Sequence, residues 1–425
     1  MKKFIILGWC GGMGGGHIYT RNQCVVAKKL GWTPIVIHNN PQEAVISDLT
    51  QFNANRVDEM CLLPSYYSKE ERCIVMGKFL SIIEPKEEDE FFVESNGVRY
   101  SYWGELLAEK LKCKHFAFLL ESYFPVKDNN YVFYSFKLKR KELAGIVQTS
   151  LPSLFGKHRK IDESENKYIK AYCTNSVEDV PYNIDVDFSQ YDIVIGNIGR
   201  SSKPYVLQVA KDLACYSQIH INKRFLFLLV GGGKGTTNEF SINHVLSGCE
   251  NVDILSTGSI FPIPKSLLSH IDVAIATSGC IRIALEANLP TVAYKDNEMI
   301  PYGICGYDIK YPLPEQPEKK RTLGEILDDI LFNDYCKKKS YTPYFNYKSD
   351  SESWSQLEED TKYMMSAPIS FEYYDTSKVY PSQIMRRLYV KTMGKLIPFH
   401  FVILLSIGVN KRLTVIRNLL KNVFS

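Results

Sequence analysis

A glycine-rich turn near the start of the chain has the composition of an anion-binding site. Residues 11–16 contain five glycines, among them Gly14, Gly15 and Gly16, and His17 follows directly. Glycine lets the backbone come close to a bulky ligand and leaves N–H groups open to an anion. A helix that begins after the turn would direct its partial positive charge to the same place. We therefore expect these three glycines to bind a diphosphate, with His17 beside the ligand.

Two other interpretations of this turn stay open. It could be a tight turn without a ligand, or it could belong to an NAD site. The glycine spacing fits the GxGxxG pattern of dinucleotide sites poorly. In addition, His38, Asn39 and Asn40 follow the second apolar run, where a dinucleotide site has an acidic residue that binds ribose.

A second candidate turn is basic. Gly199, Arg200 and Lys203 follow an apolar run in the second half of the chain. Arginine can bind two oxygens of a diphosphate at once, and lysine adds a point charge. The turn is therefore a candidate diphosphate clamp, and a surface ion pair is the alternative.

A third candidate turn contains small residues. Ser278 and Gly279 follow the apolar run 272–276 and precede a helical stretch that includes Glu286. N–H groups at the start of a helix suit a phosphate. Glu286 lies about two helical turns further on, where a carboxylate can accept hydrogen bonds from ribose hydroxyls. A solvated surface position is the alternative for this residue.

These turns need alternating strands and helices to position them. The apolar runs predict two successive α/β halves with a boundary near residue 187. In the first half we expect strands at 4–7, 34–37, 90–94, 115–120 and 145–148, with helices at 19–30 and 102–111. In the second half we expect strands at 191–195, 224–230, 252–255, 272–276 and 291–294, with helices at 205–216 and 281–287.

Composition supports a folded protein of a reducing compartment. The chain has 425 residues, of which 45% are hydrophobic and 23% charged, as in globular proteins of two or three domains. Its 11 cysteines are dispersed and form no CxxC pair, which is typical of cytosolic proteins. The apolar run 4–7 is too short for a signal peptide. The run 396–409 is too short to span a bilayer and contains Pro398 and His400.

Charge is distributed unevenly along the chain. The formal net charge is +4, yet residues 381–425 contain eight Lys or Arg and no Asp or Glu. Residues 131–141 form a second basic and aromatic stretch. Both favour an anionic membrane surface as a partner, and a core-packing helix is the alternative for the tail. The small net charge argues against nucleic acid as a partner.

The three turns together resemble those of retaining GT-B glycosyltransferases of the large bacterial polysaccharide-assembly group (the glycosyltransferase family 4-like group). The resemblance covers residues 1 to about 335. In that group a glycine turn follows the first strand, a Gly-Arg…Lys element opens the second domain, and a helix ends in Glu-Ala-x-x-x-Pro. The matching elements here are Gly14 to Gly16, Gly199-Arg200…Lys203, and Glu286-Ala287 with Pro290.

The resemblance implies a role for each matching residue. Arg200 and Lys203 would hold the donor diphosphate, and Glu286 would bind the ribose. The backbone of Gly258, Ser259 and Ile260 would frame the nucleobase.

This sequence departs from the group at two positions. Ser278 stands where the group commonly has the first Glu of a pair, and Pro204 replaces a glycine after Lys203. A Ser-Gly turn is similar to a GT-B branch that uses N-acetylglucosamine donors. The donor sugar and the stereochemistry therefore stay open, and retention is the favoured outcome.

The resemblance also points to the catalytic groups. The group often places a histidine or an acidic residue at the end of a first-domain strand, near the cleft. Glu121 follows the run 115–120, and Glu94 ends an earlier run. A carboxylate there could deprotonate the acceptor hydroxyl, or it could have a structural role. We take Glu121 and His17 as the catalytic candidates.

No metal or other cofactor is expected. Asp185 and Asp187 form a DxD pattern of the kind found in metal-dependent transferases, but it falls in the predicted interdomain linker. Loop N–H groups and helix dipoles can stabilise the leaving diphosphate without a metal.

We therefore predict a GT-B fold with Rossmann-like domains at 1–187 and 188–340. Residues 341–425 would form a connector and helices that return to the first domain or to the membrane. The predicted activity is transfer of a sugar from a nucleotide-sugar to a glycan or a polyprenyl-linked oligosaccharide of a bacterial surface polysaccharide. The enzyme would be cytoplasmic and peripheral to the cell membrane. A sugar-nucleotide 2-epimerase and a non-catalytic partner subunit are the alternatives.

Overall fold

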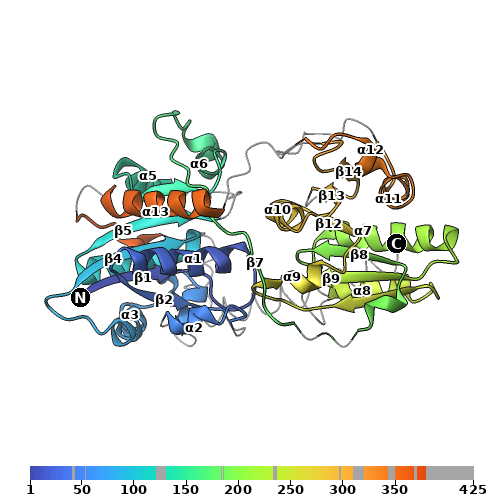
Figure 1. Cartoon of the computed structure of the whole chain (residues 1–425). Coiled ribbons are helices and arrows are strands. Elements are labelled where there is room, and N and C mark those ends of the chain that lie inside the picture. The colour runs from blue at the N-terminus through green and yellow to red at the C-terminus, as the bar shows by residue number, and fades with distance from the viewer. Residues whose placement is uncertain are drawn as a thin grey trace, which may run out of the picture.

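The chain folds into two α/β lobes, each built on a six-stranded sheet. Figure 1 shows the lobes side by side, the first in blue to teal and the second in green to orange. The structure is a computed structural model that describes residues 1–40, 44–52, 54–120, 131–182, 184, 186–232, 237–295, 298–309, 320–342, 350–367 and 371–379.

The sheet of the first lobe is parallel, with strand order β3-β2-β1-β4-β5-β6. Helices connect the strands and cover both faces of the sheet, and the central strand β1 is buried from its second residue onward. The strands are β1 Lys2–Leu7, β2 Thr33–His38, β3 Ala54–Arg56, β4 Glu90–Asn96, β5 Lys114–Leu119 and β6 Leu143–Gly145. The helices are α1 Gly15–Lys29, α2 Asp48–Gln51, α3 Lys69–Ile83, α4 Val98–Leu111, α5 Tyr131–Lys139 and α6 Ser150–Phe155.

The second lobe repeats this topology, with strand order β10-β9-β8-β12-β13-β14. Its last pair, β13 with β14, is antiparallel. The strands are β8 Ile193–Ile198, β9 Phe225–Val230, β10 Val252–Ser256, β12 Val273–Ala276, β13 Thr291–Tyr294 and β14 Pro301–Ile304. The helices are α7 Pro204–Ile219, α8 Thr237–Leu246, α9 Lys265–Leu268, α10 Gly279–Glu286, α11 Leu323–Leu331 and α12 Tyr335–Lys338.

Both sheets have the strand order of a doubly wound nucleotide-binding fold, which reverses direction beside the first strand. The reversal lies between β1 and β4 in the first lobe and between β8 and β12 in the second. Ligands of such sheets bind at the carboxyl ends of the strands at this point. The predicted GT-B architecture of two Rossmann-like lobes is confirmed.

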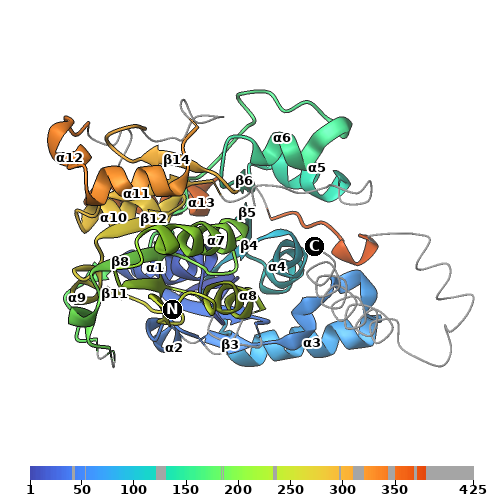
Figure 2. The same ribbon diagram turned by 90° about the vertical axis from the view of Figure 1, so that its right-hand side faces the viewer.

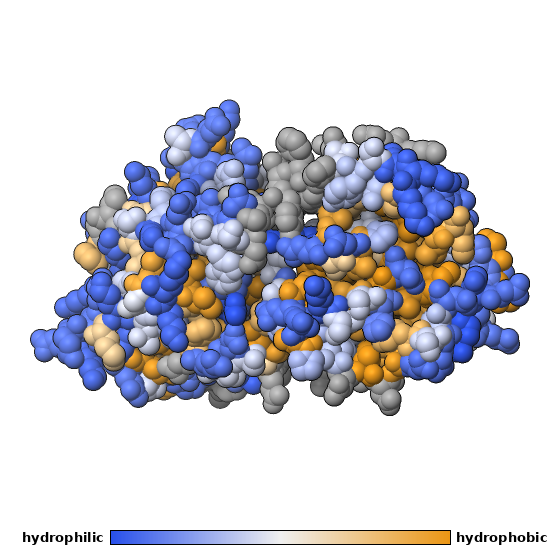
Figure 3. All heavy atoms as spheres, viewed as in Figure 1, coloured by the Kyte–Doolittle hydropathy of each residue, from blue (hydrophilic) through white to orange (hydrophobic). Residues whose placement is uncertain are grey.

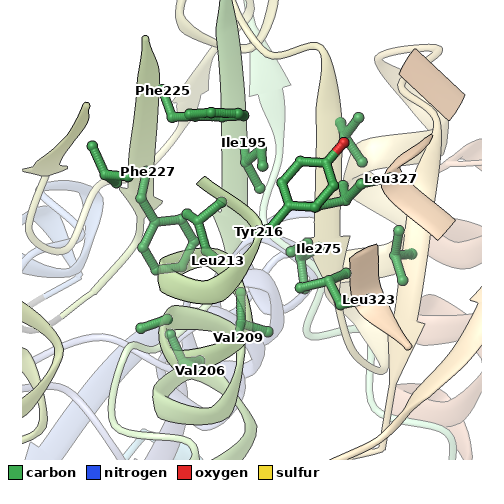
Figure 4. Close-up of a cluster of buried hydrophobic side chains, with 14 of the residues drawn as sticks. Ile195, Val206, Val209, Leu213, Tyr216, Phe225, Phe227, Ile275, Leu323 and Leu327 are labelled. Atoms are coloured by element: carbon green, nitrogen blue, oxygen red, sulfur yellow. The ribbon is translucent and has the colours of Figure 1, made fainter. Parts of the chain in front are cut away.

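The core of the second lobe shows why its helices form where they do. In Figure 4, Val206, Val209, Leu213 and Tyr216 recur at helical spacing along α7 and face the strand residues of the sheet. In Figure 2 the helices α11, α7 and α8 cover this face of the second lobe. The packed apolar stripe fixes the position of α7 on the sheet, and this fixes the turn between β8 and α7.

One long helix returns from the second lobe to the first. Figure 1 shows α13 (Asp350–Ser366) over the first lobe, whereas α11 and α12, which precede it, lie on the second. Helix α13 packs on α1 and β5. Leu357, Thr361 and Met364 are buried along its contact face.

Our prediction was wrong in placing an irregular connector at 341–380 before the returning helices. The spacing of Leu357, Thr361 and Met364 by four and three residues is a helical signal. We overlooked it among the polar residues that cover the exposed face of α13.

Two further boundaries differ from the prediction. Helix α1 begins at Gly15 rather than near residue 19, so two glycines of the turn form its first turn. Strand β6 ends at Gly145 rather than near residue 148. A Cβ on Gly145 would lie 2.3 Å from the Cβ of Ser150, because the chain turns back there into α6.

The basic and aromatic stretch 131–141 is mainly core, which contradicts its predicted role as a membrane surface. Phe133 and Tyr134 are buried, and Lys137 has no exposed surface. The Lys137 ammonium donates to Glu105 at 2.8 Å and also to Glu142. Its charge is therefore neutralised inside the lobe, where it cannot attract a membrane.

A short segment at residues 371–379, which we call the C-terminal strap, is tied to the first lobe. Tyr373 donates to the carbonyl of Cys113 at 3.1 Å, and Thr376 donates to that of Tyr102 at 3.2 Å. Val379 is buried. The basic tail at 381–425 lies outside the described residues, and Val379, the last described residue before it, lies in the first lobe.

The outer surface is mixed in character. In Figure 3, hydrophilic and apolar side chains alternate, with apolar ones most visible over the second lobe. Within the described part of the chain, no helix combines the length and the hydropathy that a bilayer crossing requires.

Candidate nucleotide-sugar site between the lobes

The glycine turn of the first lobe connects β1 to α1. Gly14 is the N-cap of α1, and its carbonyl accepts from the N–H groups of His17 and Ile18 at 3.0 and 3.2 Å. The first N–H groups of a helix have no partner within the helix, so those of Gly15 and Gly16 are available to a ligand.

Close packing explains why one of these positions is glycine. A Cβ on Gly16 would lie 2.9 Å from Cδ1 of the Trp9 indole. A Cβ on Gly15 would make only an ordinary contact, 3.4 Å from Sγ of Cys173, in the segment between the lobes. The turn therefore packs tightly on Trp9 and lies beside the interlobe segment.

His17 is held in one orientation in this turn. Its Nε2 lies 2.6 Å from the carbonyl oxygen of Gly11, so Nε2 carries the proton in the neutral ring. Its Nδ1 is buried and makes no hydrogen bond to any described residue. Burial lowers the pKa of His17, and the charge of Arg200 lowers it further, against the opposing effect of the Gly11 and Gly14 carbonyls. His17 is therefore neutral near pH 7.

The basic turn of the second lobe lies at the carboxyl end of β8. Gly199 has φ of 129°, a conformation that favours glycine, and its N–H donates to Val230 at the end of β9 at 2.8 Å. Arg200 is exposed, and Lys203 is the N-cap of α7. Both basic residues thus lie where the sheet topology predicts a ligand.

The Ser278–Gly279 turn joins the basic turn. Ser278 has φ of 50° and precedes α10. A Cβ on Gly199 would lie 3.1 Å from Sγ of Cys280, in the first turn of α10. The basic turn and the Ser278–Gly279 turn, both predicted to bind diphosphate, therefore lie side by side.

The predicted nucleoside turn is linked to the same strand ends. Thr257 Oγ1 accepts from the N–H of Gly231, after β9, at 3.1 Å, and donates to the carbonyl of Gly258 at 2.8 Å. Gly258 has φ of 70°. Ser259 and Ile260 follow directly, and Ile260 packs on the core of the second lobe.

Glu286 occupies the last position of α10 and has a partner on its own helix. Arg282 donates to Glu286 at 3.1 Å, and its guanidinium lies 5.7 Å from the Tyr172 ring. Arg282 also donates to Ser353 of α13 at 3.5 Å. We did not predict this partner of Glu286, although a spacing of four residues between Arg282 and Glu286 is a recognised ion-pair signal.

Of the two carboxylates proposed to contact the acceptor, the structure describes only Glu94. Glu121 lies outside the described residues, so its role stays a prediction. Glu94 has no exposed surface and accepts from Tyr19 at 3.0 Å and from Gln23 at 2.8 Å. Glu94 is therefore a buried structural residue beneath α1 and cannot touch an acceptor.

The described residues contain no group of three or more His, Cys, Asp or Glu side chains arranged to hold a metal ion. Asp187 of the DxD pattern accepts from the N–H of Ser189 at 3.1 Å, at the start of a short 3-10 helix. Asp185 lies outside the described residues.

No protein-family model matches this sequence, and no curated protein matches it. A glycosyltransferase from Rickettsia africae is similar in structure, with 14% identity, a TM-score of 0.49, and coverage of 92% of this chain and 98% of that one. HepE from Anabaena, solved with UDP and glucose, has 15% identity, a TM-score of 0.48, and coverage of 91% and 99%. The UDP-GlcNAc 2-epimerase from Neisseria meningitidis has 14% identity, a TM-score of 0.39, and coverage of 92% and 100%. At these identities the likeness is one of fold alone.

Proposed function

We propose that this protein is a glycosyltransferase that binds a nucleotide-sugar between its lobes. The observation that carries the proposal is the proximity of three turns around the interlobe segment. A Cβ on Gly15 would lie 3.4 Å from Cys173 of this segment, and a Cβ on Gly279 would lie 3.5 Å from Thr174. The basic turn lies beside the Ser278–Gly279 turn, since a Cβ on Gly199 would lie 3.1 Å from Cys280. Such an arrangement offers backbone N–H groups and two cations to one diphosphate.

The proposed chemistry is stabilisation of a leaving diphosphate. Arg200 and Lys203, together with the N–H groups at the starts of α1 and α10, would neutralise the charge that develops on the diphosphate as its bond to the sugar breaks and the acceptor oxygen bonds to the sugar. Neutral His17 would contact the sugar or phosphate from the first lobe. Glu121 would receive the proton of the acceptor hydroxyl. No step of this scheme needs a metal.

Nucleotide binding is the first test of the proposal. Isothermal titration and thermal shift with UDP-, GDP- and dTDP-sugars should show that one class raises the melting temperature, because a ligand of the folded state stabilises it. Arg200→Ala should abolish that shift. Arg224→Ala is the matched control, since Arg224 precedes β9 at the opposite end of the sheet and pairs with Asp253 at 3.0 Å. Equal binding by both variants would remove Arg200 from the site.

Product analysis separates transfer from epimerisation. A transferase needs an acceptor or water, whereas a 2-epimerase converts the nucleotide-sugar by itself. Incubation of the full chain with the bound nucleotide-sugar alone should return it unchanged or hydrolysed. A new nucleotide-sugar of the same mass would instead favour the epimerase.

We further propose that the acceptor is a glycan or a polyprenyl-linked oligosaccharide of a bacterial surface polysaccharide, and that the sugar is transferred with retention. The enzyme would work at the inner face of the cell membrane. The tail at 381–425 supports the membrane part, because it carries eight cations and no acid. Its start at the C-terminal strap would place the first lobe, where the acceptor is expected, near the lipid.

Vesicle binding tests the membrane part. The full chain should sediment with vesicles that contain anionic lipid and not with neutral ones, and added salt should weaken this binding. A variant with glutamine at the four basic positions of 386–395 should lose it. Equal sedimentation of the two proteins would contradict the proposal.

A further inference from the structure

The interlobe segment from Tyr172 to Val177 contacts elements on both sides of the candidate site. On the first-lobe side, Asn22 of α1 donates to the carbonyl of Tyr172 at 3.1 Å. Cys173 packs on Gly15, as described above. The segment is therefore fixed to the helix that begins at the glycine turn.

On the second-lobe side, successive residues of the segment contact two turns of the site. Thr174 Oγ1 lies 3.5 Å from the place of a Cβ on Gly279. Asn175 Nδ2 donates to the carbonyl of Ile260 at 3.0 Å. Further along, β7 (Val177–Glu178) pairs in parallel with β11 (Ile263–Pro264).

The bond from Asn175 to Ile260 connects the segment to the predicted nucleoside turn directly. Ile260 comes immediately after Gly258 and Ser259, and φ of 70° at Gly258 makes this a sharp turn. The acceptor is a backbone carbonyl, so the amide nitrogen of Asn175 must face it, and this fixes the amide orientation. The amide oxygen is buried and makes no hydrogen bond to a described residue.

We propose that Asn175 is a positioning residue that sets the nucleoside turn relative to the diphosphate turns and thereby controls nucleotide affinity. This inference rests on the proposed nucleotide-sugar site. The segment holds Gly15, Gly279 and Ile260 through three consecutive residues, 173–175. A shift of the Ile260 carbonyl would move the nucleoside turn while the diphosphate turns stay in place. Binding of the nucleoside part would weaken without loss of the fold.

The test compares two asparagines that make the same kind of bond. Asn166 Nδ2 also donates to a backbone carbonyl, that of Gln148, at 2.8 Å, and its amide oxygen is also buried and unbonded among the described residues. Asn166 lies within the first lobe, away from the three turns. Each alanine variant loses one amide hydrogen bond, and that of Asn166 is the more exposed of the two, so Asn166→Ala should lower the melting temperature by no more than Asn175→Ala does.

Only the Asn175 variants should change ligand binding. We expect Asn175→Ala to raise the Kd of the preferred nucleotide, measured with UDP, GDP and dTDP by titration calorimetry, about tenfold. The KM for the nucleotide-sugar should rise in parallel while kcat stays within about twofold. Asn175→Asp, which keeps the shape but loses the donor, should have the same effect and serves if Asn175→Ala does not fold. Asn166→Ala should leave the Kd unchanged.

Two results would overturn the inference in distinguishable ways. Nucleotide affinity within twofold of wild type in a folded Asn175 variant would reject the positioning role and leave the nucleotide site intact. A wild-type protein that binds none of the nucleotides would reject the proposed function, and the inference with it.

Discussion

The guanidinium of Arg200 in the second lobe acts electrostatically on the imidazole of His17 in the first lobe. Burial is the largest cause of the lowered pKa of His17, and the positive charge of Arg200 adds to it. The two residues are 183 positions apart in the sequence. Their interaction joins the glycine turn to the basic turn across the lobes.

This relationship predicts how His17 titrates. In Arg200→Gln the pKa of His17, followed by NMR of the ring protons, should rise relative to wild type, because a nearby cation no longer opposes protonation. It should stay below the ordinary histidine value, since burial remains. Arg224→Gln should leave the His17 titration unchanged, and an unchanged titration in Arg200→Gln would show that the lobes are further apart than described.

Packing predicts opposite effects for two glycine substitutions, one in the glycine turn and one inside α3. Gly16→Ala should lower the free energy of unfolding by about 1–3 kcal/mol, because its Cβ would contact the Trp9 indole. The Trp9 ring already packs against Tyr100 at a centroid distance of 5.8 Å, which limits its movement.

Gly77→Ala is the matched control. Gly77 lies inside α3, where a new Cβ would meet no atom within 4 Å. Alanine should therefore stabilise the helix by about 0.5–1 kcal/mol. Urea denaturation measures both effects, and a neutral Gly16→Ala would mean that Trp9 is free to move.

Glu94 predicts a pH-dependent contribution to stability. Burial raises its pKa to about 7 from the ordinary value of 4.5. Between these values the folded state binds a proton that the unfolded state does not, so this contribution is complete below pH 4.5 and is lost as pH rises to about 7. Glu94→Gln cannot ionise and should remove that dependence. The free energy of unfolding of this variant minus that of wild type should be about 1–3 kcal/mol larger at pH 8 than at pH 5.

For Glu94→Gln, the quantity to measure is the difference in free energy of unfolding between the variant and wild type at each pH. Burial also lowers the pKa of His115 to about 4, and that residue makes stability rise with pH over an overlapping range. Glu90→Gln serves as the control, because Glu90 lies on the same strand but is exposed. A Glu94→Gln difference that is constant from pH 5 to 8 would show that the carboxyl is ionised throughout.

The buried charges under α5 predict a large cost for removing Lys137. Lys137→Met should destabilise the protein by about 3–5 kcal/mol, because buried Glu105 loses its lysine partner while Glu142 keeps only its pair with Arg140 at 2.6 Å. Lys139→Met changes an exposed residue of the same helix and should cost less than about 0.5 kcal/mol. Similar values for the two variants in urea denaturation would restore the membrane-surface interpretation of this stretch.

Local pattern was sufficient to predict much of the fold. The apolar runs of β1, β4, β8 and β9 are short and end in glycine or polar turns, so their type could be read directly. The turns at Gly14 and Gly199 follow such strands, and parallel strands bring their carboxyl ends to one edge. The candidate diphosphate residues could therefore be assigned to that edge from sequence.

Long-range contacts account for what the sequence did not reveal. The cation of Lys137 looked like a surface charge, because its two acidic partners are brought to it only by folding. We did not predict helix α13, because its apolar stripe is narrow and packs on α1 and β5, which are distant in the sequence.

By itself the sequence determined that two strand-and-helix halves would form and that glycine and basic turns would end their strands, because these properties depend on neighbours in the chain. The tertiary structure alone decided that residues 173–175 contact three turns from two lobes and that Arg200 acts on His17. These relationships join residues that are distant in the chain, and their energies depend on distance and burial, which no local pattern records.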